Sequence, residues 1–204
     1  MFRKSKPAPT PTRIFVLCTG RCGSMTLSRA TAHLDNYTSD HESLTHRTGP
    51  ERFNIPEHHI EIDNRLAWLL GRLEREWGDN AAYIHLTRAP EATAQSFAKR
   101  ANQGILKAYR NDILARSKQR APKTKLIEYC RDYVDTVTQN IDLFLRDKTH
   151  KMDMTLENIG PDFDRMCNWI GATGDLEAAR AELHVQHNAT LPSKPRKPAK
   201  KGLL

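Results

Sequence analysis

The chain predicts a single α/β domain in which an open parallel sheet is flanked by helices. Short apolar runs that fit buried strands alternate with stretches whose apolar residues recur at helical spacing. Strands that alternate with helices favour a parallel sheet, because each helix carries the chain back to the start of the next strand. At 204 residues the chain is long enough to bury one such core.

The first predicted strand, residues 14–17, is an unbroken apolar run that suits the interior of a parallel sheet. A turn with two glycines, residues 19–23, follows it, and helical spacing begins directly afterwards. Such a junction aims backbone N–H groups and the positive end of a helix at one point. Arg21 adds a guanidinium, and Ser24 and Thr26 add hydroxyls. The turn is therefore predicted to bind a phosphate or sulfate group.

Two better-known phosphate loops do not fit this turn. A Walker loop needs a lysine after its last glycine, and no lysine follows Gly23. In a Cys-x5-Arg phosphatase loop counted from Cys18, the arginine position holds Ser24. The remaining alternative is an ordinary strand-to-helix turn whose glycines only relieve strain.

The rest of the chain continues the alternation of strands and helices. Further strands are predicted at 37–40, 81–87 and 150–155. Further helices are predicted at 61–77, 90–114, 126–145, 163–170 and 175–183. Asp63 or Asn64 would cap the first of these helices, Pro90 opens the second, and Asp175 caps the last. The neighbouring histidines His58 and His59 are assigned to a polar loop, because adjacent residues rarely face one metal ion.

The net charge of +8 comes from the two ends of the chain. Residues 1–13 carry four basic residues and residues 193–204 carry five, with no acidic residue at either end, so residues 14–192 carry about −1. Both ends are rich in proline, which predicts flexible tails at 1–12 and 192–204 around a domain at 13–191. Solubilising ends are the common explanation for such tails, and no specific nucleic-acid partner is expected.

The four cysteines do not form a metal-binding pattern. Cys18-x3-Cys22 has no second Cys/His pair at zinc spacing, and Cys18 is expected at the buried end of a strand. Reduced thiols are usual in the cytosol, so a cytoplasmic location is expected. No segment approaches the roughly 20 apolar residues of a membrane span, so no transmembrane segment is expected.

Two predicted strand ends present arginines to the loops that follow them, Arg21 after the first strand and Arg88 after the strand at 81–87. Ligands of open parallel sheets bind beyond the carboxyl ends of the strands. Two arginines there predict a ligand with two separated anionic groups. Ser96, about two helical turns beyond Arg88, can reach a group that Arg88 holds. An ion pair of Arg88, for example with Glu91, is the structural alternative.

At these residues the chain resembles the sulfotransferases that use 3′-phosphoadenosine 5′-phosphosulfate (PAPS). The turn at 19–26 is similar to that family's 5′-phosphosulfate loop. The run Tyr83-Ile-His-Leu-Thr-Arg88-Ala-Pro90, followed by Ser96, is similar to its 3′-phosphate motif. The resemblance covers residues 13–100 and, more loosely, 151–171. It implies a P-loop-like parallel sheet and, as ligands, PAPS and its product 3′-phosphoadenosine 5′-phosphate (PAP).

The resemblance also implies roles for single residues. The residues that would hold the 5′-phosphosulfate are Arg21, Cys22, Gly23, Ser24, Met25 and Thr26. Arg88 and Ser96 would hold the 3′-phosphate. Arginine at position 21, where the cytosolic small-molecule branch has lysine, favours the glycan, tyrosyl and bacterial branches. The family's late Arg-Lys-Gly loop has no convincing counterpart, with Arg196-Lys197 or Lys200-Lys201-Gly202 as the nearest matches.

In the glycan and tyrosyl branches, a glutamate about twenty residues beyond the loop's basic residue is the general base, and Glu42 lies 21 residues after Arg21. A carboxylate within hydrogen-bond reach can take the proton that a hydroxyl must lose as the S–O bond forms. Glu42 is therefore the expected base, with His41 as the neighbouring candidate and Arg21 as the catalytic cation. A solvated loop carboxylate and a surface histidine are the structural alternatives.

The sequence thus predicts an enzyme that moves a sulfuryl group from PAPS to a hydroxyl acceptor, such as a glycan, a phenol or another alcohol, without a metal ion. One rival is a nucleotide-dependent phosphotransferase with a degenerate phosphate loop. It would need Mg²⁺, for which Asp40 is the nearest ligand. Another is a non-catalytic module that binds a nucleotide or polyanion. The acceptor site is expected between the loop at 43–61 and the basic segment at 110–125.

Overall fold

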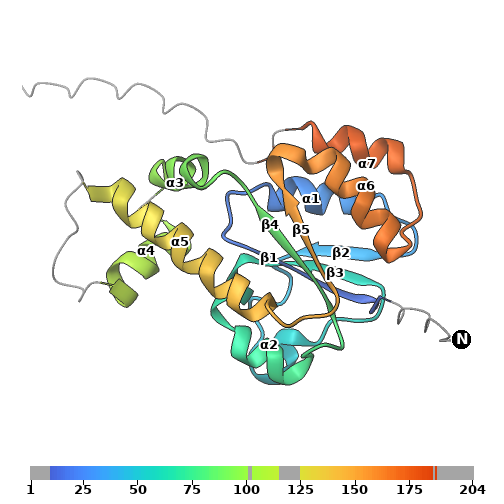
Figure 1. Cartoon of the computed structure of the whole chain (residues 1–204), viewed down its shortest axis with the longest axis horizontal. Helices are drawn as coiled ribbons and strands as arrows, with labels where there is room; N and C mark the ends of the chain where they lie inside the picture. Colours follow the sequence, from blue (N-terminus) through green and yellow to red (C-terminus); the bar gives the residue numbers. More distant parts are fainter. Residues whose placement is uncertain (1–9, 101–102, 115–124, 186, 188–204) are drawn as a thin grey trace, which may run out of the picture.

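The computed structural model describes residues 10–100, 103–114, 125–185 and 187. Five strands form a parallel sheet in the order β2-β3-β1-β4-β5. The strands are β1 (Arg13–Cys18), β2 (Thr38–His41), β3 (His59–Ile62), β4 (Ala82–Thr87) and β5 (Lys151–Thr155). Helices cover both faces of this sheet (Figure 1), so the α/β architecture that the sequence predicts is confirmed.

The helices alternate with the strands along the chain. The α-helices are α1 (Ser24–Thr31), α2 (Leu70–Glu76), α3 (Pro90–Ala98), α4 (Gly104–Ala108), α5 (Leu126–Leu145), α6 (Ile159–Ile170) and α7 (Leu176–Leu183). Short 3-10 segments are η1 (Gly49–Phe53), η2 (Asn64–Trp68) and η5 (Leu156–Asn158), and η3 (Tyr109–Leu114) is a π-helix. Pro90 opens α3, and Asp175 caps α7 by accepting a hydrogen bond from the Ala178 amide, as the sequence predicts.

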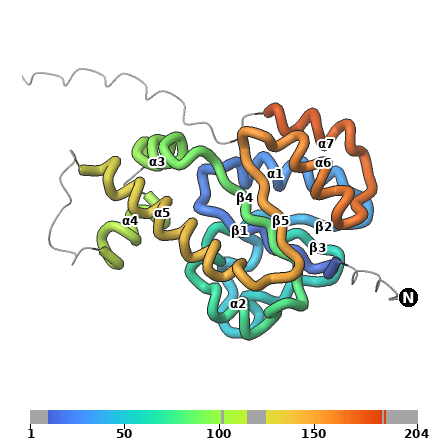
Figure 2. The backbone as a smooth tube through the Cα atoms, in the orientation of Figure 1, coloured from blue at the N-terminus to red at the C-terminus, as the bar shows by residue number. Residues whose placement is uncertain are grey.

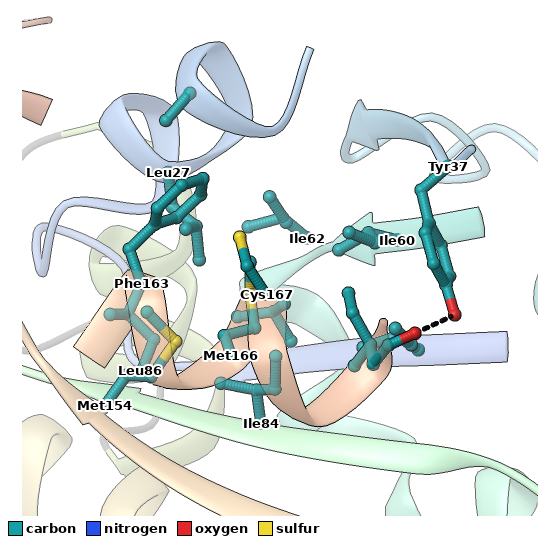
Figure 3. Close-up of a cluster of buried hydrophobic side chains, with 14 of the residues drawn as sticks. Leu27, Tyr37, Ile60, Ile62, Ile84, Leu86, Met154, Phe163, Met166 and Cys167 are labelled. Carbon is teal, nitrogen blue, oxygen red and sulfur yellow. Dashed lines mark hydrogen bonds between the residues drawn. The ribbon is translucent and has the colours of Figure 1, made fainter. Parts of the chain in front are cut away.

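The apolar core lies in two layers, one on each face of the sheet. Side chains alternate along β1, so that Ile14 and Val16 enter one layer while Phe15 and Leu17 enter the other. Helices α1, α6 and α7 cover the first layer (Figure 1). Its close packing is visible in Figure 3, where the Tyr37 hydroxyl also donates a hydrogen bond of 3.2 Å to a carbonyl of α6.

The second layer is covered by α2, α3 and α5. The apolar stripe that the sequence predicts for the long helix is buried along α5, from Cys130 through Val137 to Leu145. The backbone trace shows α3 beside α5 (Figure 2), and the two helices pack directly on one another. Since α3 follows β4, this contact fixes the segment that carries Ser96 against the sheet.

One strand departs from the sequence prediction. Residues 59–62 were expected to belong partly to a loop and partly to a helix, but they form β3, which is buried throughout. The polar residues His59 and Glu61 interrupt the apolar run that would have predicted a buried strand. Each is paired inside the fold, since the Thr38 hydroxyl lies 2.7 Å from His59 Nδ1, and the Ser43 amide donates to Glu61 Oε1 at 2.9 Å.

Two predicted helices are broken in the structure. The helix predicted at 61–77 becomes β3, η2 and α2, with Asp63 capping η2. The helix predicted at 90–114 becomes α3, α4 and η3. Before α4 the backbone is extended at Gln103, and Gly104, where α4 begins, has a φ of +57°. Trp169 in α6 is only partly buried.

The predicted tails at 1–12 and 192–204 lie outside the described residues, apart from residues 10–12, and the domain limits stay a prediction. Arg196-Lys197 and Lys200-Lys201-Gly202 fall outside them too. Of the basic segment 110–125, the structure describes only 110–114 and 125. A search of the described residues finds no helix with the length and apolar character of a membrane span.

The buried His85, which pairs with the exposed Asp142, predicts acid sensitivity. His85 on β4 is 4% exposed, its Nδ1 lies 3.2 Å from Asp142 Oδ1, and its Nε2 has no hydrogen-bond partner among the described residues. Burial lowers the pKa of His85 from its ordinary value of 6.5, although Asp142 opposes this. Below about pH 6.5 the unfolded chain therefore binds more protons than the folded protein does. The free energy of unfolding consequently decreases as the pH is lowered.

Urea denaturation at a series of pH values measures this effect. We expect His85→Gln to flatten the decline in the free energy of unfolding between about pH 7 and pH 5. His46→Gln, at an exposed loop position, serves as the matched control and should keep the slope of the unmodified protein. Parallel pH profiles for the protein and the His85 variant would show that this pair does not set the acid limit.

Candidate functional site

A cavity of about 1040 Å³ opens at the carboxyl end of the sheet. The loops that follow β1, β2 and β4 meet there, together with α3, η5 and the end of α7. Every residue that the sequence assigned to the cofactor and catalytic sites lines this cavity, with the single exception of Cys22. Two motifs that lie far apart in the sequence therefore face one space.

The turn between β1 and α1 is built for close backbone approach. Gly20, Arg21 and Gly23 all have positive φ, at 80°, 61° and 93°. A Cβ on Gly23 would lie 2.6 Å from Leu156 Cδ1, so η5 packs closely against the turn, and the φ of 93° favours glycine at this position. The first turn of α1 carries no acidic side chain, which leaves the positive end of the helix available to an anion.

Arg21 joins the two sequence motifs. Its Nε donates a 3.1 Å hydrogen bond to Ser96 Oγ, and its carbonyl oxygen accepts one of 3.4 Å from Arg88 Nη1. Burial, together with the like charges of Arg100 and Arg88, lowers the pKa of the Arg21 guanidinium. An anion bound between these cations would relieve their repulsion.

Arg88 does not form the ion pair with Glu91 that the sequence offered as a structural alternative. Glu91 pairs instead with Arg131, whose Nε lies 2.8 Å from Glu91 Oε2. The guanidinium of Arg88 points back toward the Arg21 carbonyl and lines the cavity.

The last residue of β2, His41, and the first residue of the loop after it, Glu42, lie side by side at this cavity. His41 Nε2 lies 3.1 Å from Ser24 Oγ, which ties β2 to the start of α1. The Glu42 amide donates to the Ile62 carbonyl at 3.0 Å, and the backbone then bends with a φ of 56° at Glu42. Its carboxylate, 24% exposed, lines the cavity and forms an ion pair with Arg65. Glu42 is therefore not a fully solvated loop carboxylate.

A buried ion pair supports this loop from below. Arg52 and Asp63 pair with side-chain exposures of 4% and 0%. The other oxygen of Asp63 accepts a 2.7 Å hydrogen bond from the Arg65 amide, which fixes the residue that pairs with Glu42. Burial raises the pKa of Asp63, although Arg52 opposes the shift, as expected for a carboxylate removed from water.

Cys22 is the one residue of the predicted site that does not line the cavity. It has no exposed surface and packs in the first core layer beside Cys18. The hydrogen bond between the two thiols and their burial raise the pKa of Cys18, the inner member of the pair. The two positive-φ residues before Gly23 fold the Cys22 side chain beneath the turn, so it cannot contact a ligand in the cavity.

Several cavity residues escaped the sequence analysis. The polar ones are Asn64, Gln95, Lys99, Glu157, Asn158, His184 and His187. Lys99 could have been found, because it lies one helical turn beyond Ser96. The two histidines follow α7, which packs on α1, and no local pattern connects them to the turn at 19–23. Asn64 Oδ1 is buried without a hydrogen-bond partner among the described residues.

Metal-ligand geometry is absent from the described part of the chain. No group of three or more His, Cys, Asp or Glu side chains lies there in a position to hold an ion. Asp40, the nearest magnesium ligand for the phosphotransferase alternative, does not line the cavity. Independence from metal ions stays a prediction.

The fold is similar to two solved sulfotransferase structures. The sulfotransferase domain from the curacin biosynthetic pathway is 13% identical, with a TM-score of 0.61 over 88% of this chain and 80% of that one. Mouse sulfotransferase SULT7A1 complexed with PAP is 12% identical, with a TM-score of 0.55 over 84% of this chain and 61% of that one. No protein-family model and no curated protein sequence matches the chain. The chain therefore has the sulfotransferase fold, as the sequence resemblance implied.

The buried Arg52–Asp63 pair predicts a large loss of stability when one partner is removed. Arg52→Leu leaves the Asp63 carboxylate buried and unpaired, which should lower the free energy of unfolding by about 3–5 kcal/mol. Urea denaturation measures the change. Arg47→Gln breaks the exposed Arg47–Glu51 pair, with side chains 52% and 70% exposed, and should cost less than about 1 kcal/mol. Equal losses in the two variants would contradict this assignment.

Proposed function

We propose that the protein transfers a sulfuryl group from PAPS to a hydroxyl acceptor. The observation that carries this proposal is the contact between the two arginine motifs, in which Arg21 bonds to Ser96 and accepts from Arg88 within one cavity. Two cations from different strand ends suit a ligand with two separated anionic groups, and PAPS carries such groups at its 3′ and 5′ positions. The likeness to a sulfotransferase that was solved with PAP supports the same ligand.

The donors in the cavity suit this nucleotide. The volume of about 1040 Å³ is at the upper end of ordinary ligand pockets, which span about 300–1000 Å³. The anion-binding groups are guanidinium, hydroxyl and backbone N–H donors, with no acid in the first turn of α1.

PAPS would supply the activated sulfuryl group. Arg21, Ser24 and the amides at the start of α1 would hold the 5′ side and stabilise negative charge that develops there. Arg88 and Ser96 would hold the 3′-phosphate, and Lys99 adds a further cation on the same helix face. Because the Arg21–Ser96 bond links the two halves of the site, the chain orients both ends of the nucleotide together.

Glu42 is the proposed general base. Its Oε2 is held by Arg65, which orients the carboxylate and leaves Oε1 for the acceptor's hydroxyl. The hydroxyl proton would pass to Glu42 as the new S–O bond forms. His41 lies 3.1 Å from Ser24 Oγ and is better suited to position the turn than to take the proton.

Calorimetric titration with PAP in the absence of metal tests the cofactor site. We expect micromolar affinity, lost in Arg88→Ala and weakened in Arg21→Ala. Arg29→Ala, at an exposed position of α1 away from the cavity, should bind as the unmodified protein does. Binding of ATP with Mg²⁺ but not of PAP would overturn the proposal in favour of a phosphotransferase. Binding to neither would favour a binding module.

Sulfuryl transfer from radiolabelled PAPS to a panel of phenols, alcohols and glycans tests the base. Glu42→Gln removes the proton acceptor while keeping its shape, and we expect turnover to fall by about 10²–10⁴-fold with unchanged affinity for PAP. His41→Gln is the matched variant and should retain far more activity, because its role is positional. A larger loss in the His41 variant than in the Glu42 variant would reverse the assignment.

A further inference from the structure

A second cavity lies on the other side of the Glu42–Arg65 ion pair. Its volume is about 310 Å³, and it opens between the loop after β2, η2, the start of α2 and α4. Four arginines line it: Arg47, Arg52, Arg65 and Arg72. None of the described residues that line it is acidic. So many cations around one small space predict an anionic ligand.

The arginines are not all neutralised by acids of the chain. Arg52 is fully committed to the buried Asp63. Arg47 forms an exposed pair with Glu51, and such pairs are weak and exchange readily with another anion. Arg72 is the decisive residue, because no described carboxylate forms an ion pair with it.

Neutral groups hold Arg72 in place. Its Nη2 donates a 2.7 Å hydrogen bond to the Gly49 carbonyl, and its guanidinium lies 4.9 Å from the centre of the Phe53 ring. The side chain is half-buried, so its charge is fixed in position before any ligand arrives. A fixed cation without an acidic partner is what recognition of an oxyanion requires.

The opposite wall of the second cavity is apolar. Trp68, Leu69 and Ile105 form it. The Trp68 ring packs against Tyr109 and Tyr133 at centroid distances of 5.7 and 6.3 Å, which keeps its plane in place. A flat apolar wall beside fixed guanidinium groups suits a ring-sized apolar group that carries an oxyanion.

Arg65 connects the two cavities. It lines the second cavity, while its Nη1 pairs with Glu42 Oε2 at the edge of the first. A ligand seated among the arginines of the second cavity thus lies one side chain away from the proposed base.

We propose that the second cavity binds the acceptor, and that the acceptor carries an oxyanion such as a carboxylate or a sulfonate next to an apolar ring-sized group. Arg72 and Arg47 bind the oxyanion, Trp68 contacts the ring, and Arg65 orients Glu42 toward the acceptor's hydroxyl. The acceptor role rests on the proposed sulfuryl transfer, whereas anion binding in this cavity does not depend on it.

Paired probes that differ only in charge test the site. The affinities of 4-hydroxyphenylacetate and of the neutral 4-hydroxyphenylacetamide are measured by calorimetry, with 4-hydroxybenzenesulfonate as the sulfonate arm. We expect millimolar or tighter binding of the carboxylate, about tenfold tighter than the amide. The preference should vanish in the double variant Arg47→Gln/Arg72→Gln. Arg75→Gln, an exposed arginine on the same helix as Arg72, is the matched control and should keep it.

Tryptophan fluorescence tests whether the carboxylate binds in the second cavity. A change in tryptophan fluorescence on adding the carboxylate should disappear in Trp68→Phe. Thermal unfolding checks that each variant folds, and Arg47→Gln alone, at an exposed loop position, should reduce the preference if the double variant does not fold. A preference that survives the double variant, or no binding of either oxyanion at millimolar concentration, would overturn the proposal.

Arg88→Ala separates this proposal from the sulfotransferase proposal. The carboxylate preference should persist in Arg88→Ala, because Arg88 lines only the first cavity. Loss of the preference in Arg88→Ala would place the probe in the first cavity and contradict the inference. If PAP fails to bind the unmodified protein while the preference depends on Arg72, the nucleotide proposal falls and the anion site stands.

Discussion

The parallel pairing of β1 with β4 is the interaction on which the site depends. The pairing runs to the last residue of β1, where Cys18 lies opposite Leu86. Both strands end at the same edge of the sheet, so that the loops carrying Arg21 and Arg88 begin side by side. A shift of this register would separate the two arginines and break their contacts with Ser96 and with the Arg21 carbonyl.

The site itself is not a source of stability. It brings Arg100 and Arg88 near Arg21, and burial, together with these like charges, lowers the pKa of Arg21. It also holds two non-glycine residues, Arg21 and Glu42, with positive φ, a conformation that costs of order 1 kcal/mol or more for such residues. The two apolar layers of the core must offset these terms. Because backbone strain and like charges occur together at one cavity, we interpret the cavity as a functional site.

A chain of charged groups extends the site away from the sheet. Asp63 is held by Arg52 and in turn holds the Arg65 amide, and Arg65 pairs with Glu42. The same chain separates the larger cavity from the smaller arginine-lined one. In the proposed function, nucleotide binding and acceptor recognition therefore fall to different groups of residues, with Glu42 and Arg65 between them. This separation would let the acceptor preference change without disturbing the nucleotide site.

The sequence by itself determined the features that local pattern encodes. The apolar runs of β1 and β4 and the stripe of α5 follow from burial of neighbouring side chains, and the turn at 19–23 follows from glycines and polar groups close in sequence. The two arginine motifs were found in the same way.

Only the tertiary structure decided the features that depend on distant partners. Strand β3 was missed because His59 and Glu61 are buried polar residues, satisfied by Thr38 and Ser43. Cys22 lies next to the turn's cavity-lining residues in sequence but packs in the core. Arg65 lines the second cavity and the two histidines after α7 line the first, although all three lie far from the sequence motifs. Pattern along a chain records which face of an element is buried, whereas the pairing of buried polar groups is fixed only when separate elements meet.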